Sequence, residues 1–128
     1  MKTIDVEQGM ICAAQCWDIY EEALMLYLDR LVPMITEIGD YLEAKDYEKV
    51  RMLAHSLRGM SGTVGAMALQ AQAEEMELAV LNNECDLLMK LYTPLKERAA
   101  QAQQAALILL DEMHEAIDGN QDTLDHDP

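Results

Sequence analysis

Apolar residues recur at intervals of three and four along most of this chain, the pattern of helices that each bury one face. The pattern runs through residues 19–44, 46–65, 66–81 and 84–117, with only short breaks between these segments. A shorter segment of the same kind covers residues 6–14. Four long amphipathic helices with short connections pack against one another in antiparallel order. The predicted fold class is therefore all-α: an antiparallel four-helix bundle with a short additional N-terminal helix.

The composition favours helices, and the length suits one domain. The chain has 128 residues, is 51% hydrophobic and contains ten Met but no Phe. Its abundant Ala, Leu, Glu and Gln have high helix propensity, and a chain of this size can bury a core of its own. We assign residues 1–118 to a single domain and expect the polar residues 119–128 to form a disordered tail.

Capping residues set the predicted helix ends. Asp18 and Asp46 suit the N-cap position, and Gly65 can supply the left-handed turn that ends a helix. Gly119 and Asn120 are expected to end the last helix. Pro33 is expected to kink its helix without dividing it, because the apolar stripe keeps its phase across the proline.

The segment 46–65 presents a histidine outside its apolar stripe. Its predicted core residues are Val50, Leu53, Ala54, Leu57, Met60, Ser61 and Val64. On the opposite face lie His55 and, within two turns of it, Arg51, Met52, Arg58, Gly59 and Gly62. A glycine inside a helix costs about 1 kcal/mol relative to alanine, so two of them on an exposed face indicate that space is needed there. Arginines beside an accessible imidazole are suited to hold a phosphoryl group.

The same segment resembles the signature of histidine phosphotransfer (HPt) domains. That signature has an A-H-x-L-K-G core, then a small residue and a G-A pair ten residues beyond the histidine. The matching residues are Ala54-His55-Ser56-Leu57-Arg58-Gly59, Ser61, Gly65 and Ala66. Arg58 replaces the usual lysine, which keeps the charge but exchanges a mobile ammonium for a planar guanidinium. The resemblance extends over most of the chain.

The resemblance implies a function and a role for each site residue. His55 would accept a phosphoryl group from a receiver-domain aspartate and pass it to an aspartate of another receiver. Arg58 would stabilise the phosphoryl oxygens, and Glu77 on the next helix would orient the ring. The partner surface would comprise Arg51, Met52, Gly59 and Gly62. The partners would be receiver domains of response regulators or of hybrid histidine kinases, which hold the Mg²⁺ themselves. No cofactor or bound metal is expected in this chain.

The charge narrows the range of partners. A formal net charge of −15 argues against nucleic acid and anionic membranes as partners. Four of the nine basic residues, Lys45, Lys49, Arg51 and Arg58, lie near His55. They can form a positive patch that attracts an acidic partner site, or they can be ordinary solvated charges.

We expect a cytoplasmic protein, because the chain has three cysteines, no long apolar run and a charged N-terminus. We also expect a monomer. The cysteines are expected to be buried free thiols, and the first N-terminal helix to cover one end of the bundle with Met10 and Ile11. The chain also lacks a glycine-rich nucleotide-binding motif, so no autokinase activity is expected.

Two other functions stay open. One is an adaptor that binds a receiver without transferring phosphate. The other is a metal-binding bundle that uses His55, carboxylates and His114, which follows Asp111 at a spacing found in metal sites of helical bundles. The identity of the receivers, the direction of phosphate flow, and whether the chain stands alone or comes from a longer hybrid kinase are left open by the sequence.

Overall fold

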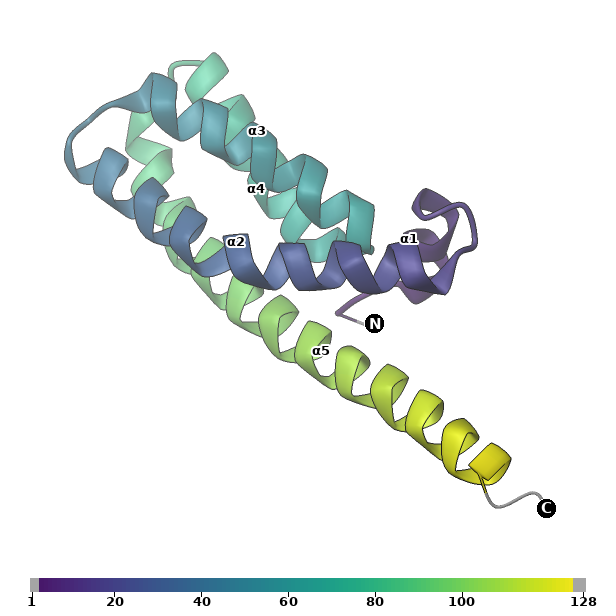
Figure 1. Cartoon of the computed structure of the whole chain (residues 1–128). Coiled ribbons are helices and arrows are strands. Elements are labelled where there is room, and N and C mark those ends of the chain that lie inside the picture. Colours follow the sequence, from purple (N-terminus) through teal and green to yellow (C-terminus); the bar gives the residue numbers. More distant parts are fainter. Residues whose placement is uncertain (1–2, 126–128) are drawn as a thin grey trace.

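The computed structural model describes the backbone of residues 3–125 and the side chains of residues 3–115. Within this range the chain is helical and has no strand, as the apolar periodicity predicted (Figure 1). The helices are α1 Val6–Cys12, α2 Trp17–Glu43, α3 Tyr47–Val64, α4 Met67–Leu81 and α5 Cys85–Asp125. The predicted all-α fold class is confirmed.

The four long helices form an antiparallel bundle in chain order. The main contacts between the long helices join α2 with α3, α3 with α4, α4 with α5, and α5 with α2, so each long helix packs on two others. The short α1 packs on α3 and α2 at one end, where the amide of Asp5 donates a hydrogen bond to the carbonyl of Gly65 over 2.7 Å. The C-terminal part of α5 extends past the other helices (Figure 1). No helix in the described range is apolar over a stretch long enough to cross a lipid bilayer.

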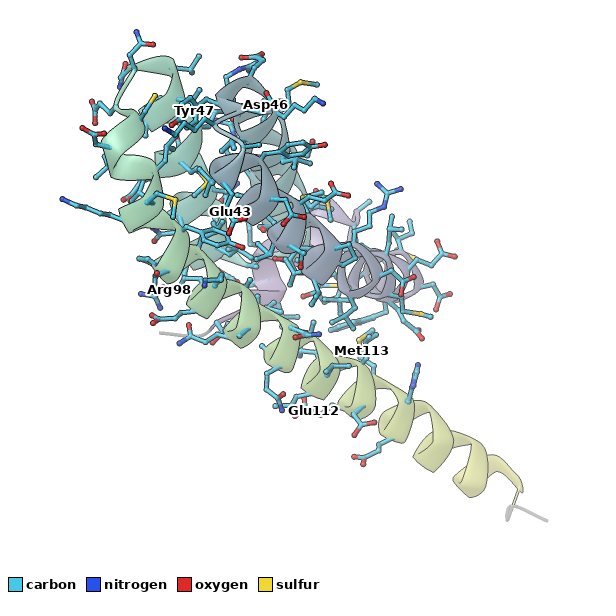
Figure 2. The ribbon with its side chains drawn as sticks, turned by 90° about the vertical axis from the view of Figure 1, so that its left-hand side faces the viewer. Glu43, Asp46, Tyr47, Arg98, Glu112 and Met113 are labelled. Carbon is cyan, nitrogen blue, oxygen red and sulfur yellow. The ribbon has the colours of Figure 1, made fainter. Side chains whose placement is uncertain are left out.

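The core lies between the four long helices and contains the residues that the α3 periodicity predicted. Val50, Ala54, Leu57, Ser61 and Val64 are buried, and Leu53 and Met60 are partly buried against the core. The stripe of α5 continues along the bundle: Figure 2 shows Met113 directed toward the other helices and Glu112 directed away from them.

Both ends of α3 and its inner face are held in place, and this fixes the direction in which its outer face points. The Asp46 carboxylate accepts a hydrogen bond from the Lys49 amide over 3.4 Å, which confirms Asp46 as the N-cap. Gly65 ends the helix with φ +87°, the left-handed conformation that was predicted. On the inner face the Tyr27 hydroxyl lies 2.9 Å from Ser61 Oγ, and burial raises the pKa of Tyr27 to about 12. The Tyr20 hydroxyl donates to the Val64 carbonyl over 2.9 Å.

Several predicted details at helix ends were wrong. α2 begins at Trp17 with Cys16 as N-cap, so Asp18 lies in the first turn and is not the cap. α1 ends at Cys12 rather than near Ala14, because Ala14 adopts a positive φ of 54°. Ile11 is 60% exposed and does not cover the bundle end.

The predicted last helix was also shorter than the helix in the structure. α5 continues to Asp125, past the predicted end near residue 117 and past the glycine at position 119. Residues 126–128 of the predicted tail lie outside the described residues, and the division between domain and tail stays a prediction. α2 is continuous through Pro33, so the helix is not divided there, as predicted.

Candidate functional site

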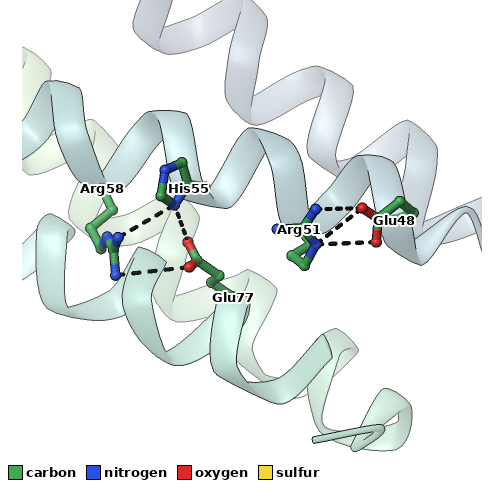
Figure 3. Close-up of polar contacts among 5 residues, drawn as sticks. All are labelled: Glu48, Arg51, His55, Arg58 and Glu77. Carbon is green, nitrogen blue, oxygen red and sulfur yellow. Dashed lines mark hydrogen bonds and ion pairs between the residues drawn. The ribbon is translucent and has the colours of Figure 1, made fainter. Parts of the chain in front are cut away.

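His55 lies on the outer face of α3, beside α4. Its side chain is 58% exposed, whereas the side chain of Glu77 on α4 is only 10% exposed. The ring Nδ1 lies 2.9 Å from Glu77 Oε2 (Figure 3). Because Glu77 projects from the buried side of α4 toward the ring, the contact between α3 and α4 decides how the imidazole is oriented.

The Glu77 contact determines which nitrogen of His55 is available for chemistry. A carboxylate oxygen only accepts hydrogen bonds, so Nδ1 must carry the hydrogen that it donates to Glu77. In the neutral ring the other nitrogen, Nε2, then has the free lone pair. The site therefore presents Nε2 as a nucleophile without needing a base to remove a proton from it.

Arg58 lies one turn after His55 and completes a cluster of three side chains. Its Nη2 is 3.3 Å from His55 Nδ1, and its Nη1 is 3.8 Å from Glu77 Oε1. The guanidinium and a protonated Nδ1 are both donors, so they cannot bond to each other, and the carboxylate of Glu77 is the favourable partner of both. Arg58 is 35% exposed and keeps a positive charge beside the ring, where an incoming anion can meet it.

Arg51 does not join this cluster. Its Nε lies 3.1 Å from both carboxylate oxygens of Glu48, and Figure 3 shows the pair apart from His55 and Arg58. The hydrogen bond from Arg51 lowers the pKa of Glu48, and that carboxylate raises the pKa of Arg51, with a smaller contribution from Glu77. The sequence interpretation missed Glu48, although its spacing of three residues from Arg51 is typical of a helical ion pair.

The predicted positive patch is accordingly weaker than the count of basic residues indicated. Lys49 lies 3.8 Å from the carboxylate of Asp46 and also faces the ring of Tyr41, while Arg51 is paired with Glu48. Arg58 is the cation of this group that contacts the histidine.

The two glycines of α3 have different surroundings. A Cβ added at Gly59 meets nothing within 4 Å, so the surface beside His55 is open there, as predicted. A Cβ at Gly62 lies 2.4 Å from Gln70 Nε2, so the end of the Gln70 side chain occupies this space and the surface is not open there. Met52 is exposed one turn before the histidine. Of the predicted partner surface, Gly59 and Met52 are freely accessible.

A second histidine, His114, and the three cysteines lie apart from this cluster. His114 Nε2 on α5 is 2.8 Å from Glu21 Oε1 on α2, so His114 does not join His55 in a common site. Among the residues whose side chains are described, no three His, Cys, Asp or Glu residues are grouped in a way that could hold a metal ion. Cys12 is exposed and Cys16 and Cys85 are partly exposed, so the prediction of buried thiols was wrong.

Comparison with protein families identifies the chain. The model of the Hpt domain matches residues 22–125, which include His55, Arg58 and Glu77. The chain belongs to the Hpt domain family, whose members are phosphocarriers that transfer phosphoryl groups through histidine in phosphorelays and interact with receiver domains. Comparisons with curated proteins and with solved structures gave no match.

From the open space at Gly59 we predict how a substitution there changes the stability of the fold. Replacing Gly59 with Ala should raise the free energy of unfolding by about 0.5–1 kcal/mol, because alanine favours the helix and its Cβ meets no obstacle. Gly62→Ala must displace the end of the Gln70 side chain and should gain less or lose stability. Urea denaturation of the three proteins measures the difference. A destabilised Gly59→Ala variant would contradict the open surface.

Proposed function

We propose that His55 is the phosphoacceptor of a multistep phosphorelay. It takes a phosphoryl group from the aspartate of one receiver domain and passes it to the aspartate of another. The observation that supports this most strongly is the exposed ring whose Nδ1 is bonded to Glu77, because this arrangement leaves the Nε2 lone pair for attack on phosphorus.

The transfer step needs no further reactant, because one bond to phosphorus forms as another breaks. The Nε2 lone pair forms the bond to phosphorus as the bond between phosphorus and the aspartyl oxygen breaks, and the receiver's carboxylate leaves with that electron pair. Transfer to the next receiver is the reverse of this step with a different carboxylate. The transition state spreads negative charge over three phosphoryl oxygens, so a nearby positive charge stabilises it. Arg58, which is accessible beside the ring, is placed for this role.

The proposed partners are receiver domains of response regulators or of hybrid histidine kinases. Met52 and Gly59 provide an accessible surface on both sides of His55 along α3, and we include Arg51 and Gly62 as neighbours of that surface. The Mg²⁺ needed for transfer is held by the receiver, and this chain acts without a cofactor or autokinase activity. We further propose that it works as a cytoplasmic monomer and, with a net charge of −15, does not bind nucleic acid.

The proposal predicts which histidine acquires the label. When the purified protein is incubated with a receiver that carries ³²P on its aspartate, label should move to the native chain and not to His55→Gln. His114→Gln is the matched control, because His114 is also a half-exposed imidazole bonded to a carboxylate, but on another face of the bundle. Its labelling should equal that of the native protein.

The adaptor alternative gives a different result in the same experiment. An adaptor binds the receiver but leaves the label on it, whichever variant is present. Binding measured by calorimetry together with absence of label on the native chain would therefore replace the proposed function with the adaptor.

The two arginines of the α3 outer face should differ in their effect on the transfer rate. Arg58→Ala should slow transfer roughly 10- to 100-fold, because it removes the positive charge beside the reacting phosphoryl group. Arg51→Ala should have a much smaller effect, since Arg51 is paired with Glu48. Rapid-quench kinetics measures both rates, and circular dichroism checks that helicity is retained. Equal slowing by the two substitutions would contradict the assigned roles.

A further inference from the structure

This inference rests on the proposed role of His55 and concerns how readily the histidine gives its phosphoryl group away. We propose that the Glu77 carboxylate keeps the proton on Nδ1 while Nε2 carries the phosphoryl group, so that phosphohistidine remains an active donor up to a higher pH than a free phosphohistidine does. Glu77 is a positioning residue in this proposal, because it acts on phosphorus only through the ring.

The geometry places a negative charge where it can act on the ring. Glu77 Oε2 is 2.9 Å from Nδ1, and the Glu77 side chain is only 10% exposed. Limited exposure means that water screens the interaction weakly, so the carboxylate favours a positively charged ring more than a surface carboxylate does. Its neighbours Met76 and Ala79 on α4 are buried in the core, which holds the carboxylate in position.

The bond changes at Nε2 show why the proton on Nδ1 matters. When Nε2 attacks, its lone pair becomes the bond to phosphorus, and a ring that keeps hydrogen on Nδ1 becomes an imidazolium. When the phosphoryl group is passed on, that bond's electron pair returns to Nε2 and the ring leaves as neutral imidazole. If Nδ1 has lost its proton in between, the ring must leave as an imidazolate, which is a far poorer leaving group. Retention of the proton therefore speeds donation.

The other charged groups near the ring do not cancel the effect of Glu77. The ring faces Glu77 on α4 and Arg58 on α3. Arg51 and Glu48, one and two turns before His55, are paired with each other. Arg58 opposes the positively charged ring in the unphosphorylated protein. Once a phosphoryl group is present, its two negative charges, shared by three oxygens, make it a stronger partner for the guanidinium than Glu77 at 3.8 Å. The carboxylate is then left to the Nδ1 proton.

A glutamine at position 77 separates the charge from the geometry. Its amide oxygen can accept from a protonated Nδ1 and its amide nitrogen can donate to an unprotonated Nδ1, so the ring stays oriented either way. Without the negative charge of residue 77, however, the protonated ring is favoured less, and the phosphorylated protein should lose the Nδ1 proton at lower pH.

The test compares pH profiles of the phosphorylated proteins. Native protein and Glu77→Gln are phosphorylated on histidine with phosphoramidate, and the rate of transfer to an unphosphorylated receiver is measured between pH 5 and pH 10. The receiver is the same in both cases, so its own titration cancels in the comparison. We expect the transfer rate of Glu77→Gln to fall at a pH about one unit or more below that of the native protein. Coincident profiles would overturn the proposal.

A second measurement uses the native protein alone and does not depend on the variant being folded. ¹⁵N NMR of phosphorylated His55 should show a proton on Nδ1 at a pH where the same nitrogen of a phosphohistidine peptide has lost it. Loss of the proton at the same pH in protein and peptide would contradict the role of Glu77. Failure of the proposed function gives a different result. In that case phosphoramidate leaves His55 unphosphorylated, or the phosphorylated protein transfers nothing to any receiver at any pH.

Discussion

The packing of α4 on α3 places the nearly buried carboxylate of Glu77 against the half-exposed imidazole of His55, and the chemistry of the site depends on that contact. Glu77 Oε2 lies 2.9 Å from Nδ1 of His55, so Nδ1 is held by the carboxylate and Nε2 is the nitrogen left free. Contacts elsewhere along α3 also hold the helix in place. Tyr20 and Tyr27 bond to its C-terminal half from α2, and Asp46 and Gly65 fix its two ends. A rigid helix with an inner face held from behind keeps the outer face in one orientation.

The outer face of α3 combines features that a helix selected for stability alone would not keep. Gly59 gives up the helix propensity of alanine although a Cβ there meets nothing within 4 Å. Met52 is exposed beside the same histidine. An open, partly apolar surface around an exposed imidazole suits transient contact with a folded partner, and the Hpt domain match gives receiver domains as that class of partner.

The features that the sequence predicted well are those that depend on periodicity and on local backbone chemistry. The apolar stripe of α3, the cap at Asp46 and the left-handed turn at Gly65 follow from residue types and spacing, and the structure confirms them. The details that failed depend on tertiary contacts or on competition between local signals. Gly62 makes room for the side chain of Gln70 on another helix, which the α3 stripe alone does not show. Arg51 pairs with Glu48 on α3 itself, a local competitor that the spacing of three residues does indicate. The distance from His55 to Glu77 also needed the structure, because 22 residues and a turn separate them.

The orientation of the His55 ring is most directly tested by ¹⁵N NMR of the unphosphorylated protein, at a pH high enough for both bonded histidines to be neutral. The two rings should show opposite tautomers in one spectrum. His55 should carry hydrogen on Nδ1, which is bonded to Glu77, whereas His114 should carry it on Nε2, which lies 2.8 Å from Glu21 Oε1. A His55 ring that carries its hydrogen on Nε2 would leave no lone pair facing the partner and would contradict the account.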